Sequence, residues 1–217
     1  IDEYKRLALE RGLVLFPGVE VTCGDTGTHL LILFETTDSQ EVVNDFLIKV
    51  GVCRASFGDS KPGTEMSVLD VIKEALKDGK VVIPAHIDEF NGICYLDNTI
   101  QEKILNNPDI NAVQLVQKEF YELSKSHKSI SKKDRELVYD IVNKRYSNMV
   151  PNGDLDKWYK TAKKFYDNQK MSCLTFSDNP HSPGESKHGL WGIGSRYTYI
   201  KISRDNPPLI SFQINAG

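Results

Sequence analysis

Residues 13–34 read LVLFPGVEVTCGDTGTHLLILF, and this stretch decides the local fold. Two apolar, β-branched runs, 13–22 and 29–34, flank the turn sequence Gly24-Asp25-Thr26-Gly27, an arrangement typical of two connected strands. We predict that the two runs pair as a hairpin-like unit. Glu20 lies in the first run, and His29 begins the second, nine residues further along the chain.

Helical patterns lie on both sides of this unit. Residues 2–11 have apolar side chains at helical spacing, and Gly12 follows where a left-handed C-cap would sit. After the second strand, Asp38 and Glu41 have the spacing of a capping box, which predicts a helix up to about Val50. We therefore expect one helix before the hairpin and another after it.

A second capping box, Ser67 with Asp70, begins a more strongly patterned helix. Its apolar stripe consists of Val68, Leu69, Ile72, Ala75 and Leu76. Gly79 ends this helix, and the run 81–86, VVIPAH, predicts a short buried strand whose last residues turn outward. The polar end of an apolar strand is a common place for chemistry, and here that end is His86.

Further strand patterns occur at 111–116, 172–176 and 196–202, with helical patterns at about 131–146 and 154–169 between them. This order of helices and strands predicts an α/β architecture with mainly parallel strands. A chain of 217 residues can bury most of the surface that its unfolded form exposes. We therefore expect one domain, residues 1–217, that needs no disulfide or structural metal in order to fold.

The net charge, the cysteine pattern and the lack of long apolar runs argue against several classes of protein. The formal net charge is −3 and the sequence pI is about 6.0, so the overall charge gives no strong nonspecific attraction to nucleic acid or membranes. Four widely spaced cysteines without a CxxC pair predict reduced thiols in a cytoplasmic protein. No apolar run is long enough for a membrane helix, so we expect a soluble protein without membrane contact. The lysine-rich segment 125–135 is more typical of a solvated helix start than of a polyanion site.

Most of the five histidines fall at strand ends or in loops rich in glycine and proline. These are His29, His86, His181 and His188, whereas His127 lies in the lysine-rich segment. Three strand ends carry candidate ligands: Glu20, His86, and Asp178 with His181. A lone Glu or His is more often a surface or core residue, but parallel α/β folds bring strand ends to one face. Carboxylates and imidazoles gathered there would suit Zn²⁺, Mn²⁺ or Fe ions.

The order of these motifs resembles a known family. The segments are 16–20 (FPGVE), 29–31 (HLL), 83–86 (IPAH), 177–178 (SD) with a nearby histidine, and 192–194 (GIG) before 198–201 (TYIK). Together they look like the successive motifs of PHP (polymerase and histidinol phosphatase) domains. The resemblance runs from about residue 4 to residue 203, and it is closest to the TrlF-like PHP domains that precede an SMC-like ATPase.

The resemblance implies a distorted (β/α)7 barrel that holds two to three divalent metal ions, Mn, Zn or Fe, at its open face. The metal ligands that it implies are Glu20, His29, His86, Asp178 and His181. Among these, Glu20 and Asp178 would also have catalytic roles. Arg196 or Lys201 could neutralise a substrate phosphate, because guanidinium and ammonium groups bind phosphoryl oxygens strongly.

The activity implied by the resemblance is metal-dependent hydrolysis of phosphate esters in nucleic acid or nucleotides, with hydroxide activated by the metal. A nuclease is favoured over a small-molecule phosphatase, and an SMC-like ATPase domain in the same or an associated chain is the implied partner. The alternative is a catalytically degenerate PHP domain that acts as a structural or interaction module beside an ATPase domain.

Two features depart from the family pattern. The family begins with an HxH strand and a later Asp-His pair, and neither precedes Ile1; we expect both to exist outside the present sequence, together with the N-terminal barrel strands. The last motif usually spaces Asp and His two apart, but Asp178 and His181 are three apart with Pro180 between them. His188 is therefore a possible substitute for His181.

Other enzyme motifs receive no support. Walker A, GxGxxG, HExxH and GxSxG patterns are absent, which argues against a P-loop NTPase, a Rossmann dehydrogenase, a zincin or an α/β-hydrolase. Cys23 could act as a thiol nucleophile with His29 close across the hairpin, but small loop cysteines are more often bystanders.

Overall fold

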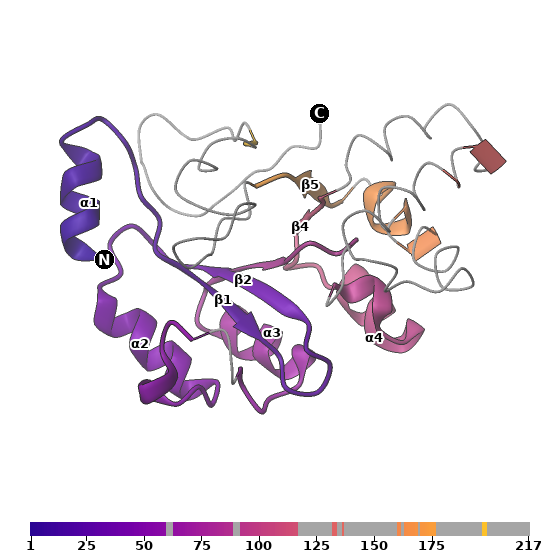
Figure 1. The fold of residues 1–217 in the computed structure, drawn as a ribbon, viewed down its shortest axis with the longest axis horizontal. Coiled ribbons are helices and arrows are strands. Elements are labelled where there is room, and N and C mark those ends of the chain that lie inside the picture. The colour runs from indigo at the N-terminus through magenta and orange to yellow at the C-terminus, as the bar shows by residue number, and fades with distance from the viewer. Residues whose placement is uncertain are drawn as a thin grey trace.

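The structure is a computed structural model that describes residues 1–59, 63–88, 92–116, 132–133, 136, 160–161, 163–168, 170–176 and 197–198. Its helices and strands are, in chain order, α1 (Asp2–Leu9), β1 (Gly18–Thr22), β2 (His29–Leu33), α2 (Gln40–Lys49), η1 (Arg54–Ser56), α3 (Val68–Lys77), β3 (Val81–Pro84), η2 (Ile93–Tyr95), α4 (Asn98–Leu105), β4 (Ala112–Gln114) and β5 (Ser172–Leu174) (Figure 1). Residues 132–133, 136, 160–161 and 163–166 are also helical.

The predicted hairpin is present. β1 and β2 pair antiparallel, with Glu20 opposite Leu31 and Thr22 opposite His29. The first strand is shorter than its apolar run, because it begins at Gly18 and the preceding segment 13–16 is not part of a strand. Local β propensity alone therefore did not place the start of the strand.

The expectation of mainly parallel strands is wrong for the described sheets. β3 pairs antiparallel with β2, which gives a three-stranded antiparallel sheet in the order β1-β2-β3. β4 and β5 form a separate parallel pair. The coarser α/β prediction is confirmed, and among themselves the described strands form two small sheets and no closed barrel.

The two faces of the β1-β2-β3 sheet have different neighbours. Val21, Leu30 and Ile32 belong to the main buried core, together with residues of α2 and α3, and Figure 1 shows these helices on one side of the hairpin. On the other face, Leu31 and Leu33 pack against a second cluster formed by Ile83, Ala112 and Leu174, so this face is directed towards β4 and β5.

The capping box predicted at the start of α3 is confirmed. The backbone N–H of Asp70 donates to Ser67 Oγ at 3.2 Å, and the Ser67 hydroxyl donates to Asp70 Oδ2 at 2.6 Å. The predicted stripe is mostly correct, because Val68, Ile72 and Ala75 are buried. Val71, which the prediction omitted, is buried with them.

We predict that Ser67→Ala lowers the free energy of unfolding by about 1 kcal/mol, because it removes the acceptor for the Asp70 N–H. Urea unfolding would measure the change. Ser39→Ala is the matched control, since Ser39 occupies the N-cap of α2 without a side-chain cap bond. Equal losses in both variants would show that the cap bond does not account for the effect.

The capping box predicted at Asp38 and Glu41 is wrong, although the helix exists. α2 begins at Gln40, with Ser39 at its N-cap. The Asp38 carboxylate instead accepts from the Glu35 backbone N–H at 2.9 Å and from Lys80 Nζ at 2.6 Å. A charged partner binds a carboxylate more strongly than a backbone N–H does, and this long-range ion pair replaces the local cap.

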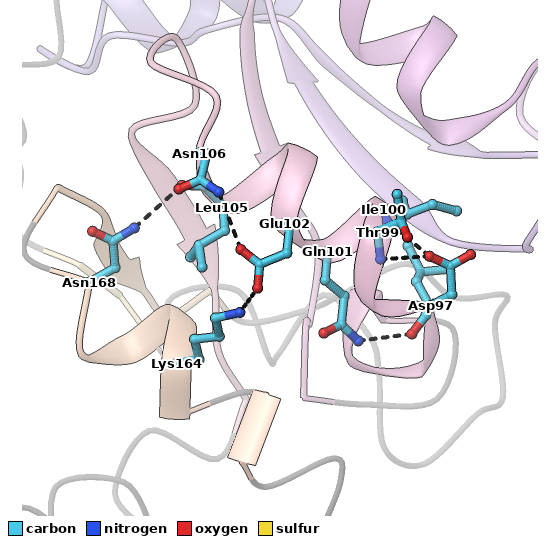
Figure 2. Close-up of polar contacts among 10 residues, drawn as sticks. Asp97, Thr99, Ile100, Gln101, Glu102, Leu105, Asn106, Lys164 and Asn168 are labelled. Atoms are coloured by element: carbon cyan, nitrogen blue, oxygen red, sulfur yellow. Dashed lines mark hydrogen bonds and ion pairs between the residues drawn. The ribbon is translucent and has the colours of Figure 1, made fainter.

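Polar side chains form hydrogen bonds at α4 and to the segments next to it (Figure 2). Asp97 Oδ1 accepts from the N–H groups of Thr99 and Ile100 at 2.8 and 3.0 Å, which caps the helix. The buried Gln101 donates to the carbonyl oxygens of Leu96 and Cys94 at 2.9 and 3.3 Å. These bonds join α4 to η2, the short helix that follows the His86 turn along the chain.

Candidate metal centre

Glu20 and His29 come together because of the register of the hairpin. Thr22 is opposite His29, and Glu20 lies two residues before Thr22, so Glu20 and His29 are on the same face of the sheet. His29 Nδ1 is 2.8 Å from Glu20 Oε1. The face is the one directed towards β4 and β5, opposite the face that α2 and α3 cover.

His86 joins this pair from the turn after β3. The Ala85 N–H donates to the His29 carbonyl at 3.1 Å, which extends the β2–β3 pairing to the residue before His86. His86 Nε2 lies 3.1 Å from His29 Nδ1 and 3.4 Å from Glu20 Oε1. The two imidazole rings meet edge to face, with centroids 5.0 Å apart and planes at 74°.

The three atoms form a triangle that a metal ion could bind. With sides of 2.8, 3.1 and 3.4 Å, the triangle has a circumradius of about 1.8 Å, shorter than a typical Zn–N or Zn–O bond of roughly 2.0–2.2 Å. One ion on the axis of the triangle can therefore reach all three atoms at normal bond length. A carboxylate and two imidazoles are also the donors that Zn, Mn and Fe ions accept.

The electrostatics of the site favour an ionised carboxylate. Burial raises the pKa of Glu20, but hydrogen bonds from His29 and His86 and their positive charges lower it more, so that the net pKa is about 2. The Glu20 side chain is 31% exposed, whereas the His86 side chain is 9% exposed. The site thus has a buried wall at His86 and is accessible from the side of Glu20.

No second cluster of this kind occurs in the described part of the chain. Glu20, His29 and His86 are the one group there in which three or more His, Cys, Asp or Glu side chains could hold a metal ion. All three were predicted as ligands from the sequence. The structure brings them together although they come from three different elements, with donor atoms within 4.8 Å of one another.

The other predicted site residues lie outside the described residues. These are the ligands Asp178 and His181, the substitute His188, the phosphate-binding candidates Arg196 and Lys201, and the excluded His127. β5 precedes Asp178 along the chain and pairs in parallel with β4. The roles predicted for these residues stay predictions.

The alternative role of Cys23 as a nucleophile is disfavoured. Cys23 is fully buried within the main core, and burial together with the negative charge of Asp25 raises its pKa to about 12. A thiol with this pKa carries almost no thiolate at neutral pH, and the thiolate is the nucleophilic form. Cys23 is therefore a core residue.

Comparisons with known proteins identify no family for this chain. The chain was compared with protein-family models, with curated proteins and with solved structures, and none of them matches it. The resemblance to PHP domains therefore rests on the sequence motifs. Within the described ranges, no helix is both long enough and apolar enough to cross a membrane.

Two supporting residues of the site were missed from the sequence. Gln114 in β4 accepts a hydrogen bond from the His86 backbone N–H, and Gly92 packs against the backbone of His86 and Ile87. The sequence did carry one indication of a role for Gln114, because it is a single glutamine within the apolar run Ala112–Val116. The residues next to Gly92 in the sequence do not distinguish it from other loop glycines, because its contacts are with His86 and Ile87, which come earlier in the chain.

Proposed function

We propose that this chain is a metal-dependent phosphoesterase of the PHP type that acts on nucleic acid or nucleotides, with a nuclease favoured. The observation that supports a metal centre is the meeting of Glu20 Oε1, His29 Nδ1 and His86 Nε2 within 4.8 Å on one sheet face. The phosphoesterase activity and the substrate class come from the motif resemblance.

The residues at the site have separable tasks. Glu20 provides the anionic donor and, through contacts at 2.8 and 3.4 Å, fixes the orientation of both imidazoles. His29 and His86 provide neutral nitrogen donors once they have lost their protons. A divalent ion bound there would acidify a water molecule and neutralise charge on the phosphate oxygens.

The sequence offers further groups for the same reaction. Asp178 and His181 would complete the ligand set for a second or third ion, and Arg196 or Lys201 would neutralise a substrate phosphate. An ion pair between one of these cations and a phosphate would hold the scissile ester at the site. This arrangement would bind the phosphodiester backbone without reading its bases, because phosphate contacts carry no sequence information directly.

We predict that the protein in its longest native form hydrolyses a phosphodiester in the presence of Mn²⁺ and that Asp178→Ala removes this activity. A chromogenic phosphodiester, a short single-stranded oligonucleotide and a nucleoside monophosphate would be tested in parallel. Cleavage of the oligonucleotide would support a nuclease, whereas release of phosphate from the monophosphate alone would support a small-molecule phosphatase.

His127→Ala is the matched control for loss of a charged or ligating residue. Its lysine-rich surroundings in sequence disfavour a cation, so we expect unchanged activity and metal content. Absence of hydrolysis by folded protein with bound metal would contradict the phosphoesterase and favour a degenerate interaction module.

A further inference from the structure

The backbone of His86 has an uncommon conformation. Its φ of 25° makes it the one non-glycine residue with positive φ in the described part of the chain. This region of φ is unfavourable for a residue with a β-carbon, and it persists where surrounding contacts hold it. The direction in which the His86 imidazole points depends on this φ, because the φ of a residue sets how its own Cα–Cβ bond is oriented relative to the preceding backbone.

β4 is hydrogen-bonded to the turn. Gln114 Oε1 accepts a hydrogen bond from the His86 N–H at 3.1 Å, and the Gln114 backbone carbonyl accepts one from the Ile87 N–H at 2.9 Å. Gln114 is 3% exposed, and the residues on either side of it in the strand run are buried and apolar. Burying an amide in such a place is costly unless it is hydrogen-bonded.

The turn also contacts η2. The Ile87 carbonyl accepts from the Cys94 N–H at 3.2 Å, and Gly92 packs so closely that a β-carbon on it would lie 2.5 Å from the His86 carbonyl oxygen and 2.6 Å from that of Ile87. The turn therefore has contacts with both β4 and η2. Among the described residues, the Gln114 side chain bonds to the backbone N–H of the candidate ligand itself.

We propose that Gln114 is a positioning residue for the metal ligand His86, an inference that rests on the metal centre of the proposed function. An apolar side chain could fill the same place in β4, but it could not accept the His86 N–H. Without that acceptor the turn is free to relax towards negative φ, and Nε2 then moves out of the triangle that it forms with Glu20 and His29. Gln114 thus preorganises the metal site without touching the ion.

The test is Mn²⁺ binding measured by titration calorimetry on the longest native form. Gln114→Met keeps the size of the side chain and removes the acceptor, and we expect its affinity to fall by about 10–100-fold, the range usual for residues that orient a ligand. Gln114→Glu retains an acceptor oxygen and should restore most of the affinity. Should Gln114→Met fail to fold, Gln114→Asn carries the same expected loss, because its oxygen is drawn back from His86 by one methylene.

Thr64→Val is the matched control. Thr64 is another buried polar residue, but its hydroxyl donates to the Val50 carbonyl and accepts from the Met66 N–H, and it bonds neither to a candidate ligand nor to η2. We expect it to lower thermal stability and leave the Mn²⁺ affinity unchanged. A loss of affinity equal to that of Gln114→Met would show a general effect of destabilisation and overturn the proposal.

Hydrogen exchange in the metal-free protein gives a second readout. The His86 amide should exchange faster in Gln114→Met than in the wild type, because its acceptor is gone. Wild-type affinity together with an equally protected His86 amide in this variant would overturn the positioning role and leave the metal centre intact. Failure of the wild type to bind Mn²⁺ would instead contradict the proposed function, and the role of Gln114 with it.

Discussion

Glu20→Ala is expected to lower the affinity for Mn²⁺ by more than about 100-fold and to abolish hydrolysis, while the protein stays folded. The loss should exceed the roughly 10–100-fold that is usual for outer residues, because Glu20 Oε1 is itself one of the three converging donors. It is also the one anion in the group, and it faces both histidines. Calorimetric titration and metal analysis of the purified variant would measure the effect.

We expect the Glu20→Ala variant to stay folded for a structural reason. The Glu20 side chain lies on the half-exposed face of β1, and the backbone pairing with Leu31 does not depend on it. Glu74→Ala removes a carboxylate from α3 that pairs with Lys49 at 2.9 Å, and it serves as the matched control with unchanged Mn²⁺ affinity. Unchanged metal content in folded Glu20→Ala would remove Glu20 from the site.

Features that depend on nearby residues could be predicted from the sequence. The two residues of the Ser67 capping box are three positions apart, and the β1–β2 hairpin is set by one turn, so both follow from local pattern. The Asp38 capping box failed because the partner of Asp38 is Lys80, 42 residues further along the chain. No periodicity in a short window contains such a partner.

The predictions of strand direction and strand length were wrong for a related reason. Apolar runs that are buried on both faces look alike in parallel and antiparallel sheets, so the run containing β3 did not reveal that it pairs antiparallel with β2. Likewise, the segment 13–16 has the composition of a strand, yet in the structure the strand begins at Gly18. Pairing partners, and not propensity, decide these two features.

The structure brings three of the predicted site residues together, although only part of the sequence argument for them holds. The sequence argument placed Glu20 and His86 at strand ends that parallel strands would bring to one face, and it placed His29 at the start of the strand that pairs with the strand of Glu20. His29 is indeed the first residue of β2, and the register of the hairpin brings it to Glu20, but the strand before His86 pairs antiparallel with β2 and not parallel. Gln114 was missed because its bond to the His86 N–H joins residues 28 apart in sequence.

Gly92→Ala is expected to destabilise the protein and to weaken Mn²⁺ binding together. A β-carbon at this position would lie 2.5 Å from the His86 carbonyl oxygen, 2.6 Å from that of Ile87 and 2.7 Å from the Ile87 carbonyl carbon. These are backbone atoms and cannot rotate away, so either η2 or the His86 turn must shift. We expect a loss at the upper end of the roughly 1–3 kcal/mol typical of overpacking.

Gly18→Ala is the control that separates this clash from the general cost of replacing glycine. Its β-carbon would come closest, at 3.0 Å, to Leu33 Cδ2, the end of a flexible side chain, so we expect a change below about 1 kcal/mol. Urea unfolding with and without Mn²⁺ would test the coupling, because a ligand stabilises the folded state by an amount set by its affinity. If Gly92→Ala loses only metal-free stability and keeps the full stabilisation by Mn²⁺, η2 supports the fold without positioning His86. If the stabilisation by Mn²⁺ is lost as well, the close packing of Gly92 on the His86 turn is part of what shapes the site.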